Sequence, residues 1–331
     1  MPQTPAPRKR LRLGLWIPLL LALLLAAGWS VAWRIAAQEV EQTLDEGVQT
    51  LAARGVTAEW SERRLSGYPF RLNVTLTDLR VTSGSWGLRI PDFEAQAFLH
   101  APRSWLSAAP EGLTIFRPEG GGLEVREDRL LSSLVLPSAG PPRLSIEGLG
   151  LVFTPAPGAR PFALTSADRL ELHVRPGPED KAAVFLRLQD GTPTPGRLLA
   201  DIGGGASVAA TAEGRLERAS RLRGEDLSGA LAAWGVAGGR LEILQAGLTA
   251  RETRLSLTSP GLSAGADGRL RGSLRLTAAQ APTLLIALAR HGVLSPTEAA
   301  GGLVGILAGK SSGDDLQVVL TLSEGKVRLS R

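Results

Sequence analysis

The chain contains no cysteine, a single tyrosine and three histidines among its 331 residues. The absence of cysteine excludes disulfides, thiolate catalysis and cysteine-ligated metal sites. The histidines His100, His173 and His291 stand far apart, and none forms an i, i+4 pair with another ligand residue. Metal ligands usually show such regular spacing. We therefore expect no metal and no cofactor.

Net charge is also missing from most of the chain. The formal charge of +5 is accounted for by Arg8, Lys9, Arg10, Arg12 and Arg34, because residues 1–34 contain no acid. The remaining basic residues balance the 32 acidic ones and are interspersed with them. Nucleic-acid binding needs a clustered basic face, so this distribution argues against a nucleic-acid partner in spite of a pI of about 10.3.

The longest uncharged stretch runs from Leu13 to Trp33. A helix of this length spans roughly the ~30 Å hydrocarbon thickness of a bilayer. Trp16 and Trp33 lie near its ends, where indole rings favour the membrane interface. The basic cluster directly before it predicts a cytoplasmic N-terminus over residues 1–12, a transmembrane helix over 13–33 and a translocated body. In a bacterial inner membrane that body lies in the periplasm.

A cleavable signal peptide is the main alternative for this segment. Its apolar core would be only about 7 to 15 residues long and would precede small residues. Here the core is longer, and the bulky run Trp29–Arg34 follows it. We expect the segment to be retained as a signal anchor.

Residues 34–55 show a helical period, with Val40, Leu44, Val48 and Leu51 on one face and Gly55 as a C-cap. This predicts a juxtamembrane amphipathic helix that packs on the body. From Val56 the period becomes two, and many short alternating segments are separated by Pro- and Gly-rich turns.

The sequence therefore predicts a mainly β chain. Its expected fold is an N-terminal transmembrane helix and a juxtamembrane helix, followed by a large curved antiparallel β-sheet with a few short helices packed on it. Helical segments are expected at 227–236, 282–291 and 296–307. Residues 56–331 form the predicted periplasmic domain, with a possible subdivision near 195–215.

Two motifs with catalytic associations fail on context. The pattern Gly261-Leu262-Ser263-Ala264-Gly265 follows a proline and precedes a turn, whereas a nucleophile elbow needs a strand and then a helix. The stretch from Gly305 to Ser311 has three residues between its glycines, whereas a phosphate-binding loop has four. We expect the protein not to be an enzyme.

The segment Gly67-Tyr68-Pro69-Phe70-Arg71 contains the only tyrosine. The residue before a proline favours extended geometry, and the glycine permits a turn. We interpret it as a rigid corner that opens the next strand, with Tyr68 covering the hairpin; a structural role is favoured over ligand contact.

The N-terminal anchor, a Trp60-containing strand, the Gly67–Arg71 motif, Gly-x-Leu strands and a final hairpin follow one another in this chain. In this order they resemble the uncharacterised envelope family catalogued as domain of unknown function 2125, over most of residues 30–331. The resemblance implies an alphaproteobacterial inner-membrane protein and carries over no catalytic residue. The layout is more distantly similar to AsmA-like proteins, whose long sheets curve into apolar grooves associated with lipid traffic.

Two functional hypotheses follow. An apolar sheet face that stays open would bind phospholipid or another lipid, because acyl chains need shape and apolarity more than directional contacts. The candidate wall residues are Phe70, Leu72, Val74, Leu76, Trp86, Leu88 and Ile90. The same residues fit a sealed core equally well. The alternative is a scaffold or assembly subunit of an envelope or secretion complex, with other envelope proteins as partners.

Overall fold

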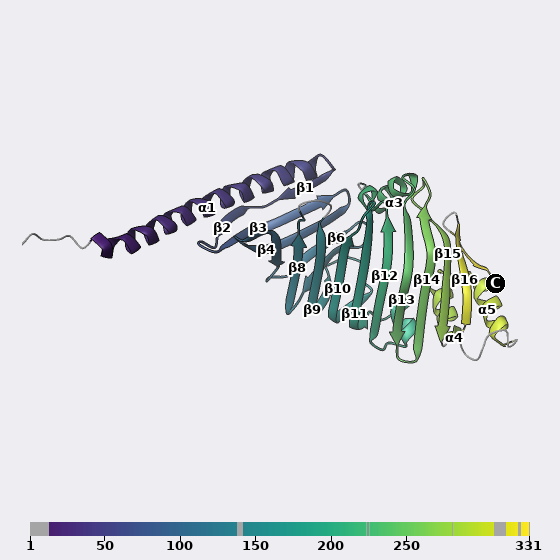
Figure 1. The fold of residues 1–331 in the computed structure, drawn as a ribbon. Helices are drawn as coiled ribbons and strands as arrows, with labels where there is room; N and C mark the ends of the chain where they lie inside the picture. The colour runs from purple at the N-terminus through teal and green to yellow at the C-terminus, as the bar shows by residue number, and fades with distance from the viewer. Residues whose placement is uncertain are drawn as a thin grey trace, which may run out of the picture.

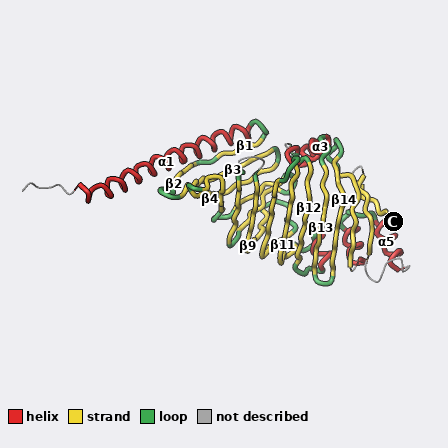
Figure 2. Tube along the Cα trace, viewed as in Figure 1, coloured by secondary structure: helices red, strands yellow, loops and turns green. Residues whose placement is uncertain are grey.

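The computed structural model describes residues 13–137, 142–222, 224, 226–279, 281–307, 316–323 and 326–330. Arg8, Lys9, Arg10 and Arg12, which carry the prediction of membrane orientation, lie outside the described residues. The predicted mainly β fold is confirmed: one large antiparallel sheet follows a long N-terminal helix and carries a few short helices (Figures 1 and 2).

Helix α1 (Leu13–Ala52) joins the two predicted N-terminal helices into one element of 40 residues, about 60 Å long. Its first half is apolar and exposed, and it is long and apolar enough to cross a membrane. Further along, Val40 and Leu44 pack against the sheet, as the helical period predicts. The helix ends where Gly55 adopts a positive φ of 75° and donates its N–H to the carbonyl of Ala52.

All described strands belong to one sheet, in which every pairing is antiparallel. Their bounds are β1 Val56–Glu59, β2 Glu62–Ser66, β3 Arg71–Ser83, β4 Trp86–Phe98, β5 Ala101–Ala108, β6 Leu113–Arg117, β7 Gly121–Arg126, β8 Arg129–Val135, β9 Arg143–Pro155, β10 Leu164–Pro176, β11 Lys181–Pro193, β12 Val208–Glu217, β13 Arg240–Ala250, β14 Thr253–Ala264, β15 Leu270–Ala279, β16 Leu316–Ser323 and β17 Lys326–Ser330.

The sheet begins beside α1 and ends at the C-terminus (Figure 1). β1 and β2 lie end to end along β3, and Ser61 between them donates to the carbonyl of Thr77. β3 pairs with β4, whose two halves pair with β5 and β6. β5 pairs with β8 and β6 pairs with β7, and both β7 and β8 then pair with β9. From β9 to β17 each strand pairs with the next along the chain. Hairpins thus build the sheet almost entirely in chain order.

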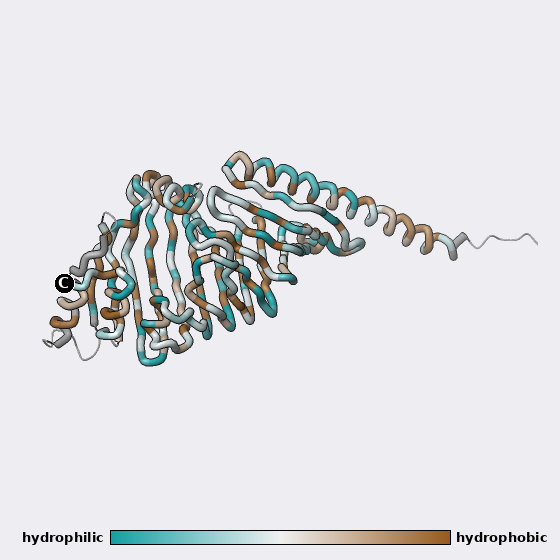
Figure 3. The backbone as a smooth tube through the Cα atoms, turned by 180° about the vertical axis from the view of Figure 1, so that it is seen from behind, coloured by the Kyte–Doolittle hydropathy of each residue, from teal (hydrophilic) through white to brown (hydrophobic). Residues whose placement is uncertain are grey.

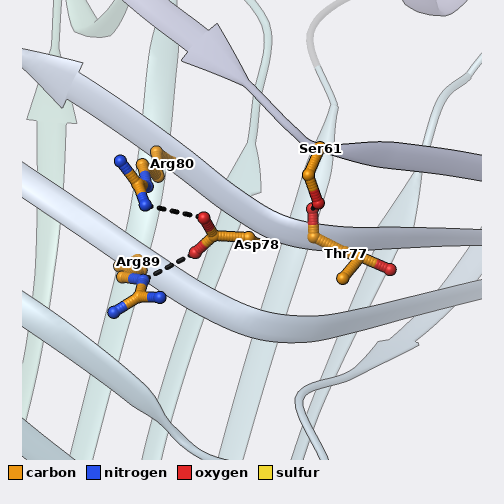
Figure 4. Close-up of polar contacts among 5 residues, drawn as sticks. All are labelled: Ser61, Thr77, Asp78, Arg80 and Arg89. Atoms are coloured by element: carbon orange, nitrogen blue, oxygen red, sulfur yellow. Dashed lines mark hydrogen bonds and ion pairs between the residues drawn. The ribbon is translucent and has the colours of Figure 1, made fainter.

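The pairing of β3 with β4 is irregular at one pair of facing positions near the centre of both strands. Asp78 has a left-handed backbone conformation with φ of 51°, and the position facing it is Pro91, which has no N–H to donate. The Asp78 carboxylate accepts hydrogen bonds from Arg80 at 2.7 Å and Arg89 at 2.6 Å (Figure 4). These hydrogen bonds lower the pKa of the Asp78 carboxyl, and the bond from Arg89 has the larger effect. The alternation of buried positions along β3 shifts by one residue at this point.

Short helices cover the two ends of the strands in the second half of the sheet. α3 (Leu227–Val236) lies at the upper end in Figure 1, and α4 (Ala281–Arg290) lies at the lower end, next to α5 (Pro296–Leu307). These three helices match the predicted segments. The sequence interpretation missed α2 (Leu198–Gly203). It falls in the region of the predicted subdivision, yet β11 and β12 on either side of it pair directly, so the sheet continues without a break.

An ion-pair group joins α2 to α4. Asp201 Oδ2 lies 2.9 Å from Arg290 Nη1 and 3.0 Å from His291 Nε2. The hydrogen bond from His291, followed by that from Arg290, lowers the pKa of Asp201 below its ordinary 3.8. Stability from this group is therefore present above the unfolded-state pKa and is lost as the pH falls through the lower folded-state pKa.

We expect the thermal midpoint of Asp201→Asn to fall less steeply with acidification below about pH 4 than that of the native chain, because the variant has no carboxylate to protonate. Thermal unfolding of the full chain in detergent, measured as a function of pH, checks this. The control is Asp168→Asn, at an exposed position on β10. Parallel acid profiles for the native chain and Asp201→Asn would contradict the prediction.

Candidate functional site

A continuous row of apolar residues crosses the sheet. Residues that face each other in an antiparallel pair lie on the same side of the sheet. The strand register therefore places eight apolar residues in one line over β9 to β16: Ile146, Leu172, Leu186, Ala212, Ala246, Leu257, Leu276 and Val318. Apolar and hydrophilic positions alternate along the same strands (Figure 3), so the opposite side has a different character.

A second row runs beside the first on the same side of the sheet. It starts at Trp105 on β5 and continues through facing residues on the neighbouring strands: Leu134, Leu144, Val174, Val184, Gly214 and Ile243. The two rows together make a broad apolar surface in the middle of the sheet.

Packing closes this surface at both ends and leaves its middle open. At the first end, α1 packs on the buried cluster of β3 and β4. At the other end, Leu257, Leu276 and Val318 belong to the cluster formed with α2 and α4. The residues between belong to none of the three buried clusters, and Leu186 is 37% exposed. We name these residues the open apolar face: Leu134, Leu144, Ile146, Leu172, Val174, Val184, Leu186, Ala212, Ile243 and Ala246.

The opposite side of the same strands is polar. Glu171, only 6% exposed, lies 2.6 Å from Arg169 and 3.5 Å from Arg187, and Arg169 also contacts Glu147 at 2.6 Å. Further along this side, a hollow of about 540 Å³ opens around Gly247, lined by polar residues such as Thr211, Ser256 and Thr277 together with apolar ones. Among the described residues, no group of three or more histidine, aspartate or glutamate side chains is placed to hold a metal ion.

The predicted wall residues fall into two sets. Leu72, Val74, Leu76 and Ile90 are buried, at 0 to 7% exposure. Leu88 packs against the cluster that contains the last three of them. Phe70 and Trp86 are exposed, at 65% and 40%, and lie near opposite ends of the β3–β4 pair.

The open apolar face lies on other strands than those of the predicted wall residues. Its alternation is visible in the sequence, for example in Leu170-Leu172-Val174 and Val184-Leu186-Leu188. Which alternating strands a helix covers depends on where α1 docks, and a repeating pattern does not encode this.

The Gly67–Arg71 motif forms the turn before β3, and it also binds α1. Gly67 has φ of 103°, and a Cβ there would lie 2.7 Å from the Arg71 carbonyl oxygen, so glycine is required. Trp29 Nε1 donates to the carbonyl of Pro69 at 2.7 Å, and Trp33 Nε1 donates to that of Arg71 at 2.8 Å. The motif therefore fastens the sheet to the long helix.

The tyrosine of the motif also faces α1. Tyr68 Oη and Ser30 Oγ share a hydrogen bond of 2.8 Å, and the Tyr68 ring meets Trp33 edge-on at 5.7 Å. Phe70 lies 6.2 Å from Trp29, measured between ring centroids. The helix side chains that bind the motif are those that the sequence marks as the interfacial end of the apolar span.

Comparison with known proteins places the chain in a family without supplying an activity. No curated protein and no solved structure matches it. One family model matches residues 33–330, which include the end of the apolar span, the Gly67–Arg71 motif and all described strands of the sheet. The chain therefore belongs to the family described as uncharacterized proteins conserved in bacteria, DUF2125.

Proposed function

We propose that this protein is a non-enzymatic, membrane-anchored lipid-binding protein, and that acyl chains lie on the open apolar face. The observation that carries the proposal is the unbroken row of facing apolar residues from Ile146 to Ala246, which lies outside every buried cluster. A soluble domain rarely leaves a contiguous apolar surface of this extent without a ligand or partner.

The shape of the surface favours an extended apolar ligand. Neighbouring strands lie about 4.8 Å apart, so the row from Ile146 to Ala246 is roughly 19 Å long. This approaches the length of a fatty-acyl chain. The similarity in layout to AsmA-like proteins, whose grooves are associated with lipid traffic, agrees with this ligand class.

The membrane placement belongs to the same proposal. α1 supplies one span, and the basic residues Arg8, Lys9, Arg10 and Arg12 before it favour a cytoplasmic N-terminus. The sheet then lies in the periplasm, beside the inner membrane from which lipid would come. Binding of lipid there would serve maintenance of the envelope.

Native mass spectrometry of the full chain, extracted from bacterial membranes in detergent, tests the proposal. We expect phospholipid to remain bound after the detergent is removed in the gas phase. A chain that carries no lipid, and that in-cell crosslinking joins to a stoichiometric envelope protein, would contradict lipid binding and favour the scaffold hypothesis.

A further inference from the structure

The loop between β2 and β3 lies beside the C-terminal end of the apolar span in α1. The apolar span has no charge from Leu13 until Arg34, so Arg34 marks where the helix leaves the hydrocarbon region. The loop binds Trp33 and also Trp29, which lies one helical turn, about 6 Å, deeper. This tip of the sheet therefore lies beside the last turns of the apolar span (Figure 1).

Several backbone carbonyls of the loop have hydrogen-bond partners within the protein. Carbonyl groups left unpaired in hydrocarbon are energetically costly. The carbonyls of Pro69 and Arg71 accept from the two indoles, that of Gly67 accepts from the N–H of Arg71, and that of Phe70 accepts from Leu99. Four of the loop's backbone acceptors are thus paired without water.

The side chains that the loop leaves exposed are aromatic. Phe70 is 65% exposed and Tyr68 is 55% exposed, although both contact α1. Phe98, which faces Arg71 across the β3–β4 pair, is 49% exposed, and the Arg71 guanidinium lies 5.3 Å from its ring centroid. Tryptophan and tyrosine rings are typical of the membrane–water interface, and this loop places Tyr68 against Trp33.

We propose that Tyr68, Phe70 and Phe98 form a membrane-contact foot, which inserts into the headgroup region of the bilayer that α1 crosses. The occupant is the lipid surface itself, because the foot is continuous with the membrane-spanning helix. A second contact besides α1 fixes the orientation of the sheet relative to the bilayer. The inference rests on the membrane anchoring included in the proposed function and is independent of lipid binding on the open apolar face.

The absence of cysteine makes a direct test practicable, since every introduced cysteine is the only one. Three single-cysteine variants of the full chain, Phe70→Cys, Phe116→Cys and Leu21→Cys, each receive one nitroxide label. Each variant is reconstituted separately in phosphatidylcholine vesicles. Phe116 on β6 is the matched control: it is an exposed phenylalanine, and it faces Gly87, at the end of β4 remote from Phe98. Leu21 reports the middle of the span.

We expect the label at Phe70 to collide with a water-soluble nickel chelate at least about threefold less often than the label at Phe116, and to have higher access to oxygen. Equal nickel access at Phe70 and Phe116 would overturn the foot. If the label at Leu21 is also open to the chelate, the membrane span itself is refuted, and the foot is refuted with it. Protection at Leu21 with free access at Phe70 refutes the foot alone.

Discussion

Trp234→Ala is expected to lower the free energy of unfolding by about 3–5 kcal/mol, the usual cost of removing a fully buried tryptophan. Trp234 is 1% exposed and donates its indole N–H to the carbonyl of Glu217 at 2.7 Å, so it joins α3 to the end of β12. The backbone of Gly239 passes so close that a Cβ there would lie 2.2 Å from the indole ring. The truncation leaves a cavity that neighbouring backbone cannot fill.

Denaturant unfolding of the full chain in detergent measures this effect. The control is Val236→Ala in the same helix: Val236 is 75% exposed, so its truncation should change stability by no more than about 0.5 kcal/mol. A loss under about 1 kcal/mol for Trp234→Ala would mean that α3 does not contribute to the cooperative core.

Leu186→Glu is expected to reduce retained lipid at least about tenfold, because a carboxylate next to acyl chains costs more than the 1.4 kcal/mol that corresponds to a factor of ten. Leu186 lies in the middle of the open apolar face, between Leu172 and Ala212. Since the side chain is already 37% exposed, the charged variant should still fold. Native mass spectrometry of the extracted chain gives the retained lipid.

The matched control is Val152→Glu. Val152 is an aliphatic residue of β9, 48% exposed. The alternation of β9 shifts at Gly150, which has φ of 60°, so that Leu151 and not Val152 lies on the side of the open apolar face, in one buried cluster with Leu170 and Leu188. The same charge is therefore added on the other side of the sheet. Equal lipid loss in both variants would show that general destabilisation is responsible, and unchanged lipid in Leu186→Glu would place the ligand elsewhere.

Local pattern was sufficient to predict most elements. The uncharged run of α1, the period of two in the strands and the limits of α3 to α5 depend on side chains a few residues apart, and such spacing is written directly in the sequence. α2 was missed because it is short, with six residues, and makes its main contacts with α4 and β13 far away in the chain.

The candidate site could be predicted only in kind. Strands in which apolar and polar residues alternate predict a sheet with one apolar face. Each strand has the same alternation whether a helix covers that face or not. Val74 and Leu186 stand in equivalent patterns, yet the first is 3% and the second 37% exposed, because Val74 belongs to the buried cluster on which α1 packs and Leu186 belongs to none of the buried clusters. The role of Tyr68 was equally hidden, since Ser30 is 38 residues away.

The sequence by itself determined that this chain has one apolar span, an electrically neutral β-rich body and no cysteine chemistry, because composition and short periods fix these properties without reference to distant residues. Only the tertiary structure decided that the span and the following helix are one continuous element, that Trp29 and Trp33 hold the Gly67–Arg71 motif, and that the apolar surface left open lies on β8 to β13. These features arise from contacts between residues far apart in the chain, and such contacts are set by how α1 and the short helices dock on the sheet.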